Sequence, residues 1–335
     1  MKAPGHARAQ AATVDATAAV PAAVNAAAAA VNATPAAVNA TAATVAPVAP
    51  APRPGPVLSD QGLQSIHRVP SHNQFGEAQS INIVGELPLT IKVDGQELVT
   101  LMTLGTHPEK LVLGYLRNQT LFERPAQIKS IRVDWRREVA EVATVSGAGV
   151  PRLAELKRTV TTGCGQGTVL SCTLDKLYEH RLPPMEIRQS AIYRVLAQVA
   201  RHNRAYRLAG SVHGCGLCRD GEVLLFIEDV GRHNAMDTIA GEMWLRDMRG
   251  RDKIFYTTGR LTSEIVMKAA LMEVPVLVSR NGATHMGFEL AEQLGVTLIA
   301  RAKSRQFVAL NAGNLVFDQP PPRPQSQTPT PGDPR

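Results

Sequence analysis

The sequence contains few cysteines and no long apolar run. Its four cysteines, at positions 164, 172, 215 and 218, are too sparse in 335 residues for a disulfide scaffold, and this usage is typical of a reducing compartment. No stretch of about 20 apolar residues is free of proline and charge, so we predict no membrane span. We therefore expect a cytoplasmic protein.

Large side chains are scarce at both ends of the chain. The first 56 residues consist mainly of Ala, Val, Thr, Pro and Asn, and their prolines interrupt any continuous helix. No run of Leu, Ile or Phe follows Lys2 and Arg8, which disfavours a signal peptide. We predict a disordered Ala/Pro-rich extension over residues 1–69 and a disordered Pro-rich tail over residues 319–335.

Positive charge is in mild excess only. The formal net charge is +7, and the basic residues are dispersed along the chain. This balance suits an anionic ligand or partner, whereas a nucleic-acid-binding domain usually carries a clustered basic face. We therefore expect no nucleic acid among the partners, because that interpretation would rest on a pI of about 9.4 alone.

The part of the chain over residues 70–189 is predicted to be a strand-rich N-terminal subdomain. Residues 79–103 alternate apolar and polar side chains around Asp94-Gly95, which indicates a hairpin. Residues 107–118 have helical spacing with a proline in the first turn. Two further strands are expected, at 127–134 and 138–145.

The pattern changes over residues 190–318, where helices and strands alternate. Helices are predicted at 190–199 with Ser190 as the cap, and at 234–247, 262–272 and 285–295. Strands are predicted at 222–229, 253–259, 274–280 and 296–302. This order favours a layered α/β subdomain with mainly parallel strands. Ligands bind beyond the carboxyl ends of such strands, so we expect one cleft at the loops 229–233, 257–260 and 279–282.

Two of these loops carry an arginine directly before a helix. Arg232 and His233 follow Gly231, and Arg260 follows Gly259. A helix N-terminus attracts anions, so the repeated arrangement indicates a phosphate-containing ligand. The simpler alternative is structural, with Asn234 capping the helix that follows. Asp229 and His233 are candidate proton acceptors by their chemistry alone.

Cys164 lies between glycines in "TTGCGQGT". The glycines allow a sharp turn that leaves the sulfur accessible, and Lys157 and Arg158 favour its thiolate form. These features indicate a nucleophile, although an ordinary loop residue would fit the same spacing.

Cys215 and Cys218 form a C-x-x-C pair behind His213. The pair suits a redox centre or half of a metal site, but a zinc site needs two further ligands. Zinc-dependent deamination is disfavoured because no His-x-Glu precedes the pair and no proline stands before Cys215. The chain also lacks the phosphate-binding G-x4-G-K-[ST] and the dinucleotide-binding G-x-G-x-x-G motifs, which disfavours ATP hydrolysis and NAD chemistry.

Several longer strings point to a known family. They include "GELPLTIKVDGQ", "EDVGRHNAMDTIAG", "TTGRLTSEIVMKAALMEVPVLVSRNGAT" and "ELAEQLGVTLIARAKSRQF". The chain resembles the formate dehydrogenase accessory proteins of the FdhD type from about residue 80 to 318. This resemblance implies a cytidine-deaminase-like α/β fold without the deaminase metal, and a homodimer.

The resemblance also implies a sulfurtransferase. In such proteins a cysteine desulfurase supplies sulfur as a persulfide. The accessory protein passes it to the molybdenum bis(molybdopterin guanine dinucleotide) cofactor, a bound substrate, before the cofactor enters the formate dehydrogenase apoprotein. Cys164 matches the first cysteine of the family's C-x-x-C loop, and Gly167 replaces the second. The family's cofactor segment falls on Phe307, Val308, Ala309, Leu310, Asn311 and Ala312.

Three hypotheses therefore stand side by side. The first is sulfur transfer through a persulfide on Cys164, which acts alone or with Cys172, Cys215 or Cys218 in place of the missing partner at Gly167. Its expected cofactor-binding residues are Arg232, His233, Gly259, Arg260 and the segment 307–312. The second is a non-catalytic chaperone that binds the cofactor through Arg232, His233 and Arg260. The third is a metal-binding redox module built on Cys215 and Cys218.

Overall fold

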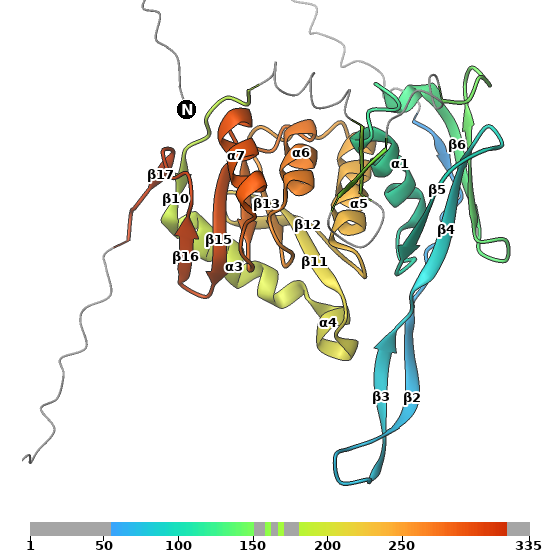
Figure 1. Cartoon of the computed structure of the whole chain (residues 1–335), viewed down its shortest axis with the longest axis horizontal. Helices are drawn as coiled ribbons and strands as arrows, with labels where there is room; N and C mark the ends of the chain where they lie inside the picture. The colour runs from blue at the N-terminus through green and yellow to red at the C-terminus, as the bar shows by residue number, and fades with distance from the viewer. Residues whose placement is uncertain (1–54, 151–157, 162–166, 171–180, 320–335) are drawn as a thin grey trace, which may run out of the picture. The chain divides into compact units, whose positions relative to one another are not determined.

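The computed structural model describes residues 55–150, 158–161, 167–170 and 181–319 (Figure 1). For residues 158–161 and 167–170 it describes the backbone. In the part described, the chain forms a mixed α/β structure with a strand-rich N-terminal region and a larger sheet in its C-terminal half.

The N-terminal region is built on a five-stranded sheet in the order β1-β6-β7-β4-β5. Its strands are β1 (Val57–Leu58), β4 (Leu87–Val93), β5 (Gln96–Thr103), β6 (Ile128–Asp134) and β7 (Val139–Thr144). The hairpin of β4 and β5 turns at Asp94-Gly95, where both residues have positive φ, as predicted. The helix predicted at 107–118 is α1 (Pro108–Asn118), and a 3-10 turn, η1 (Pro125–Gln127), leads into β6.

Two strands of this region begin before the predicted start at residue 70. β1 pairs in parallel with β6, and β2 (Ile66–His72) forms a separate hairpin with β3 (Ala78–Val84). The extension predicted to be disordered over 1–69 therefore reaches too far. Backbone pairing, which a short strand obtains from its neighbour, orders these residues despite their weak apolar pattern.

The C-terminal half contains a six-stranded sheet in the order β12-β11-β13-β14-β15-β16. Its strands are β11 (His213–Arg219), β12 (Glu222–Asp229), β13 (Ile254–Thr257), β14 (Val276–Ser279), β15 (Thr297–Lys303) and β16 (Gln306–Ala309). The four predicted strands, β12, β13, β14 and β15, run in one direction, but only the pairs β13–β14 and β14–β15 are parallel neighbours, because two strands that were not predicted run against them. The difference arises from β11 and β16, because each joins its neighbour through a tight antiparallel connection.

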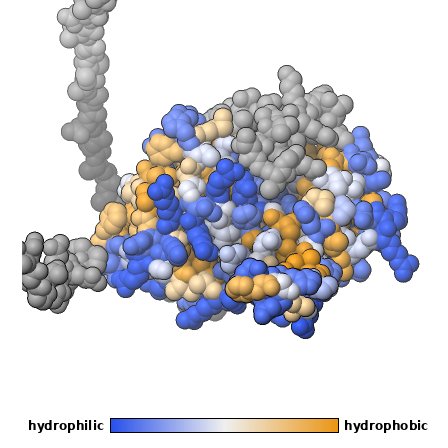
Figure 2. Space-filling model, turned by 60° about the horizontal axis from the view of Figure 1, so that its bottom comes forward, coloured by the Kyte–Doolittle hydropathy of each residue, from blue (hydrophilic) through white to orange (hydrophobic). Residues whose placement is uncertain are grey.

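Helices cover both faces of this sheet. They are α3 (Gln189–His202), α4 (Arg204–Ala209), α5 (Arg232–Leu245), α6 (Ser263–Leu271) and α7 (His285–Leu294). The helices α5, α6 and α7 share one apolar core with the sheet, and α3 shares another. On the face in Figure 2 hydrophobic and hydrophilic residues are interspersed, as expected when most large apolar side chains lie inside.

Two predicted helix caps are wrong. α3 begins at Gln189, so Ser190 lies inside its first turn, where its backbone N–H and hydroxyl donate to the Asp318 carboxylate at 2.9 and 2.5 Å. α5 begins after Gly231, so Asn234 lies within the helix rather than before it. The helix predicted to end at Gly295 does end there, because Gly295 adopts a left-handed φ of 73°.

Two further pairs of short strands complete the described chain. β8 (Arg158–Thr161) and β9 (Gly167–Leu170) pair antiparallel, and β10 (Ile187–Arg188) pairs in parallel with β17 (Leu315–Val316). No helix in the described ranges is long and apolar enough to cross a membrane.

Candidate functional site

Three loops meet at one edge of the six-stranded sheet, as the sequence predicts. β12 and β13 are both antiparallel to β11 and so run in the same direction, and β14 is parallel to β13. The register places Thr257 opposite Cys215 on one side and Ser279 on the other, and Asp229 opposite His213. The loops that follow these three strands therefore share an edge with the beginning of β11.

Hydrogen bonds join the loops after β13 and β14 to each other and to the start of β11. The Ser279 hydroxyl donates to the Gly259 carbonyl at 2.5 Å, and Asn281 Nδ2 donates to the Thr258 carbonyl at 2.6 Å. The Thr258 hydroxyl lies 3.2 Å from His213 Nδ1 and also accepts the backbone N–H of Gly214 at 3.1 Å. These hydrogen bonds set the geometry of the two loops before any ligand arrives.

The Asp229 carboxylate has a structural role. Its buried carboxylate accepts hydrogen bonds from Thr103 Oγ1 at 2.6 Å, from the Leu104 and Gly231 backbone N–H groups at 3.1 Å each, and from Asn234 Nδ2 at 3.0 Å. Burial raises the pKa of Asp229, although these hydrogen bonds act in the opposite direction. The carboxylate thus joins the start of α5 to the end of β5.

The ring of His233 is neutral, and both of its nitrogens are buried. Burial, and then the charge of Lys268, lowers the pKa of His233 to about 3. Its Nδ1 lies 3.2 Å from Glu264 Oε1, but neither ring nitrogen makes a hydrogen bond. With a neutral ring this contact is not a charged pair.

Arg232 is also buried, with 5% of its surface exposed. Its aliphatic chain packs against Gly259 so closely that a Cβ at position 259 would lie 2.3 Å from Arg232 Cδ. Its Nε and Nη2 have no hydrogen-bond partner. By contrast Arg260, predicted from sequence to be its equivalent, is exposed. Thus the structure brings Arg232 and Gly259 together and leaves Arg260 at the surface.

The segment 307–312 begins in the outermost strand of the same sheet. Its first residues belong to β16, an edge strand, and the Phe307 ring lies 5.8 Å from the Tyr193 ring on α3. Asn311 joins the segment to β15, because it accepts the Leu298 backbone N–H at 2.6 Å and donates to the Val296 carbonyl at 2.7 Å. The predicted cofactor residues therefore form two groups, one at the loop edge and one at β16.

A cavity of about 610 Å³ lies beneath α3, next to the second group. Its lining includes Tyr193 and Tyr256 and four basic side chains, those of Arg194, Arg280, Lys303 and Arg305. The Arg305 guanidinium lies over the Tyr193 ring, 5.0 Å from its centroid. Arg280 follows β14 and so connects this cavity with the loop edge. Sequence reasoning missed the cavity because Tyr193 and Arg194 fit the pattern of an ordinary amphipathic helix.

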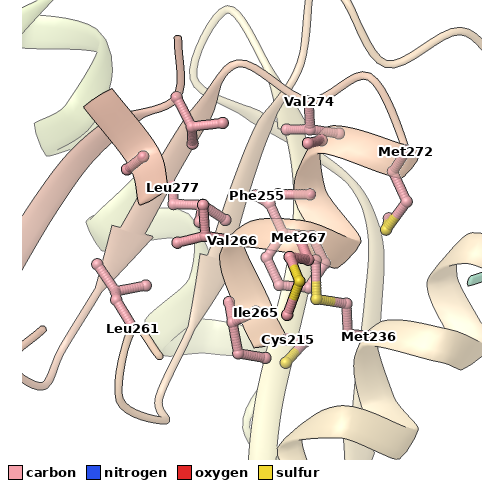
Figure 3. Packing of buried hydrophobic residues seen from close by; sticks show 14 of the residues in the cluster. Cys215, Met236, Phe255, Leu261, Ile265, Val266, Met267, Met272, Val274 and Leu277 are labelled. Atoms are coloured by element: carbon pink, nitrogen blue, oxygen red, sulfur yellow. The ribbon is translucent and has the colours of Figure 1, made fainter. Parts of the chain in front are cut away.

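Cys215 and Cys218 lie on opposite faces of the sheet. Cys215 belongs to the core beneath α5 and α6, where Figure 3 places it beside Met236 and Ile265, and Cys218 belongs to the core beneath α3. Both are free thiols, and burial raises the pKa of each to about 12. This arrangement contradicts the redox and metal hypotheses for the pair. Over the described ranges, no group of three or more potential metal ligands occurs.

Cys164 and Cys172 fall outside the described residues. In the sequence, Cys164 belongs to the five residues between β8 and β9, whose facing ends are the paired residues Thr161 and Gly167.

Comparisons with known proteins agree with one another. A family model described as the FdhD/NarQ family matches residues 84–314. A protein of Bacillus pumilus named sulfur carrier protein FdhD is 29% identical over 240 residues, which cover 70% of this chain and 92% of that one. Its namesake from Bacillus subtilis is 29% identical over 226 residues, covering 67% and 86%. A solved structure of a formate dehydrogenase accessory protein from Desulfotalea psychrophila has a TM-score of 0.59 and 23% identity, covering 75% of this chain and 98% of that one, and so supports the fold.

Proposed function

We propose that this chain, which belongs to the FdhD/NarQ family, is a sulfur carrier of formate dehydrogenase maturation that holds the sulfur as a persulfide on Cys164. The proposed sulfur source is a cysteine desulfurase, and the proposed acceptor is the molybdenum bis(molybdopterin guanine dinucleotide) cofactor. We place this function in the cytoplasm and assign it to a homodimer.

The observation that carries the proposal is the state of the other described thiols. Cys215 and Cys218 are buried and protonated, whereas sulfur transfer needs a thiolate that a partner can reach. A carrier must therefore use Cys164 or Cys172, and only Cys164 lies between glycines. Because Gly167 replaces the family's second cysteine, the transfer proceeds through one thiol in that segment.

Loading the carrier is a thiol exchange. The Cys164 thiolate attacks the outer sulfur of the desulfurase persulfide, a new S–S bond forms, and the desulfurase cysteine leaves as a thiolate. The extra sulfur is thereby moved without any net oxidation or reduction. No described thiol of this chain takes part in that step.

The cavity beneath α3 supports the cofactor as the acceptor. Its lining includes the Tyr193 ring, on which a guanine base can stack, and its basic side chains offer hydrogen bonds to phosphate oxygens. Phe307 adjoins this cavity through its contact with Tyr193, whereas Asn311 and Ala312 line a separate cavity. We assign the guanine end of the cofactor to this cavity.

The test is to incubate the purified full-length protein with a cysteine desulfurase and cysteine, and to map its thiols by mass spectrometry without reductant. We expect one additional sulfur on Cys164 that cyanide or a reductant removes. Cys164→Ala should abolish the modification, and Cys172→Ala is the matched control that should retain it. Sulfur on Cys172 instead would transfer the carrier role to that residue.

A non-catalytic chaperone is the second candidate, and Gly167 is the feature that favours it. Such a protein would bind the cofactor and mature formate dehydrogenase with no dependence on a thiol. Absence of persulfide at every cysteine, with an active desulfurase and intact maturation by Cys164→Ala, would establish the chaperone and reject the carrier.

A further inference from the structure

Buried polar atoms that have no hydrogen-bond partner among the described residues lie at the beginnings of α5 and α6. Five such atoms belong to Arg232, His233 and Thr262, namely Arg232 Nε and Nη2, both His233 ring nitrogens and Thr262 Oγ1. Arg232 and His233 are the first residues of α5, and Thr262 directly precedes α6. Buried polar groups are normally hydrogen-bonded, so a cluster of this kind indicates the place of a missing partner.

The missing partner is an anion. A buried guanidinium without a counterion is strongly unfavourable, because it loses its hydration and gains nothing in exchange. Nε and Nη2 are the donors along one edge of the planar guanidinium. This edge can bind two oxygens of one anion in a bidentate manner. In the described residues no carboxylate pairs with Arg232.

The groups around Arg232 leave its charge uncompensated. Cys215 is a neutral thiol and His233 a neutral ring, and burial together with Arg232 lowers the pKa of His213. The Asp229 carboxylate is occupied by four donors. Glu264 lies 3.5 Å from Lys268 and so already has a cation beside it.

We propose that Arg232 and the beginnings of α5 and α6 form a binding site for a phosphate group. A carboxylate would satisfy the guanidinium alone, whereas the several oxygens of a phosphate also accept from the Thr262 hydroxyl and from a ring N–H of His233. The helices α5 and α6 both begin here, so their N-terminal dipoles add attraction for an anion.

This site is distinct from the cavity beneath α3. α5 and α6 share a core on one face of the sheet, and α3 covers the other face. The proposal deepens the proposed function, on which it rests for one of two sources of the phosphate: the pyrophosphate of the cofactor, or a free phosphate ion.

Thermal unfolding of the full-length protein in inorganic phosphate tests the site, with chloride at equal ionic strength as reference. We expect phosphate to raise the Tm of the wild type, because a ligand that binds only the folded state stabilises it. Arg232→Met should not respond to phosphate. Without phosphate its Tm should exceed that of the wild type by about 2–4 °C, because the substitution removes an uncompensated buried charge.

The matched control is Arg251→Met, which removes an exposed arginine paired with Glu273. Its response to phosphate should equal that of the wild type. A phosphate response that persists in Arg232→Met would overturn the proposal. So would a marked fall in the Tm of ligand-free Arg232→Met, since that result would assign Arg232 a structural role.

A parallel titration with GDP identifies the source of the phosphate. If the cofactor supplies it, the rise in Tm that GDP causes should be smaller in Arg232→Met than in the wild type, because the cavity beneath α3 still binds the guanine end. If the site takes free phosphate, Arg232→Met should retain the GDP response, and Arg305→Met, in the cavity beneath α3, should lose it. Persulfide formation on Cys164 needs neither ligand, so failure of this proposal is distinguishable from failure of the sulfur carrier.

Discussion

Lys268 on α6 donates a hydrogen bond to the Asp237 carboxylate on α5 across 2.8 Å, and both side chains are buried. The same carboxylate accepts Asn118 Nδ2 from α1 at 2.7 Å, and Glu264 lies 3.5 Å from Lys268. Burial alone would lower the pKa of Lys268, but the two carboxylates outweigh it and raise that pKa. The Asp237 carboxylate thus links three helices, α1, α5 and α6, beside the candidate site.

Removal of the Lys268 ammonium should therefore destabilise the protein. Lys268→Met leaves two buried carboxylates without their cation, and we expect the free energy of unfolding to fall by about 3–5 kcal/mol in guanidinium denaturation. The matched control is Lys110→Met, because Lys110 pairs with Glu242 at 2.8 Å but is partly exposed. This variant should lose about 1 kcal/mol or less. Equal losses in the two variants would contradict a special role for the buried pair.

The crossing of α1 and α5 depends on two glycines. A Cβ at Gly114 would lie 1.6 Å from the Asp237 carbonyl oxygen, and one at Gly241 would lie 2.0 Å from the Lys110 carbonyl oxygen. Gly241→Ala should force the helices apart and lower the free energy of unfolding by about 1–3 kcal/mol or more, as urea denaturation would measure. Gly313→Ala is the control, since nothing lies within 4 Å of its Cβ position. An unchanged stability of Gly241→Ala would show that the crossing tolerates a methyl group.

Much of the fold follows from local pattern. The helix ending at Gly295 and the hairpin at Asp94-Gly95 were predictable because glycine marks each with a positive φ. The strand β11 was not, since its glycines are unusual within a strand. Two of these glycines, Gly214 and Gly216, pack closely against the Phe226 ring. A Cβ at Gly214 would lie 2.7 Å from this ring, and one at Gly216 would lie 3.2 Å from it. Sequence alone does not reveal such a neighbour.

The location of the candidate site was predictable from the sequence, but the burial of its side chains was not. Polar, glycine-containing ends of successive strands indicated the loop edge, and the register confirms that they meet there. Arg232 and Arg260 have the same spacing before the helices predicted from the sequence. In the structure Arg232 is instead the first residue of α5 and is buried, whereas Arg260 precedes α6 and is exposed. Burial of an arginine is set by the tertiary packing of Gly259 against its chain, which no local pattern encodes.

His233 should make the protein sensitive to moderate acid. Its pKa in the folded state is lowered to about 3, mainly by burial, whereas the unfolded chain binds the proton near the ordinary histidine value of about 6.5. Between these two values the unfolded state binds more protons, so the free energy of unfolding falls as the pH falls from 6.5 towards 3. His233→Gln should reduce this slope in denaturation series at pH 7 and pH 4.5. Gln in place of the exposed His285 is the control, and an equal slope in the wild type and His233→Gln would exclude His233 as its source.

The thiols of Cys215 and Cys218 should resist alkylation in the folded protein. Both are buried, and a pKa of about 12 leaves almost no thiolate at pH 8. Brief treatment with iodoacetamide, followed by mass spectrometry, should therefore label neither residue. Cys164 should be labelled if it is the sulfur-carrying residue, because that role needs a reactive thiolate. The same treatment in guanidinium chloride supplies the internal control, because unfolding exposes all four cysteines to the reagent. Labelling of Cys215 or Cys218 in buffer at the rate seen in denaturant would mean that the sheet opens readily at β11, and it would restore these thiols as candidates for the relay.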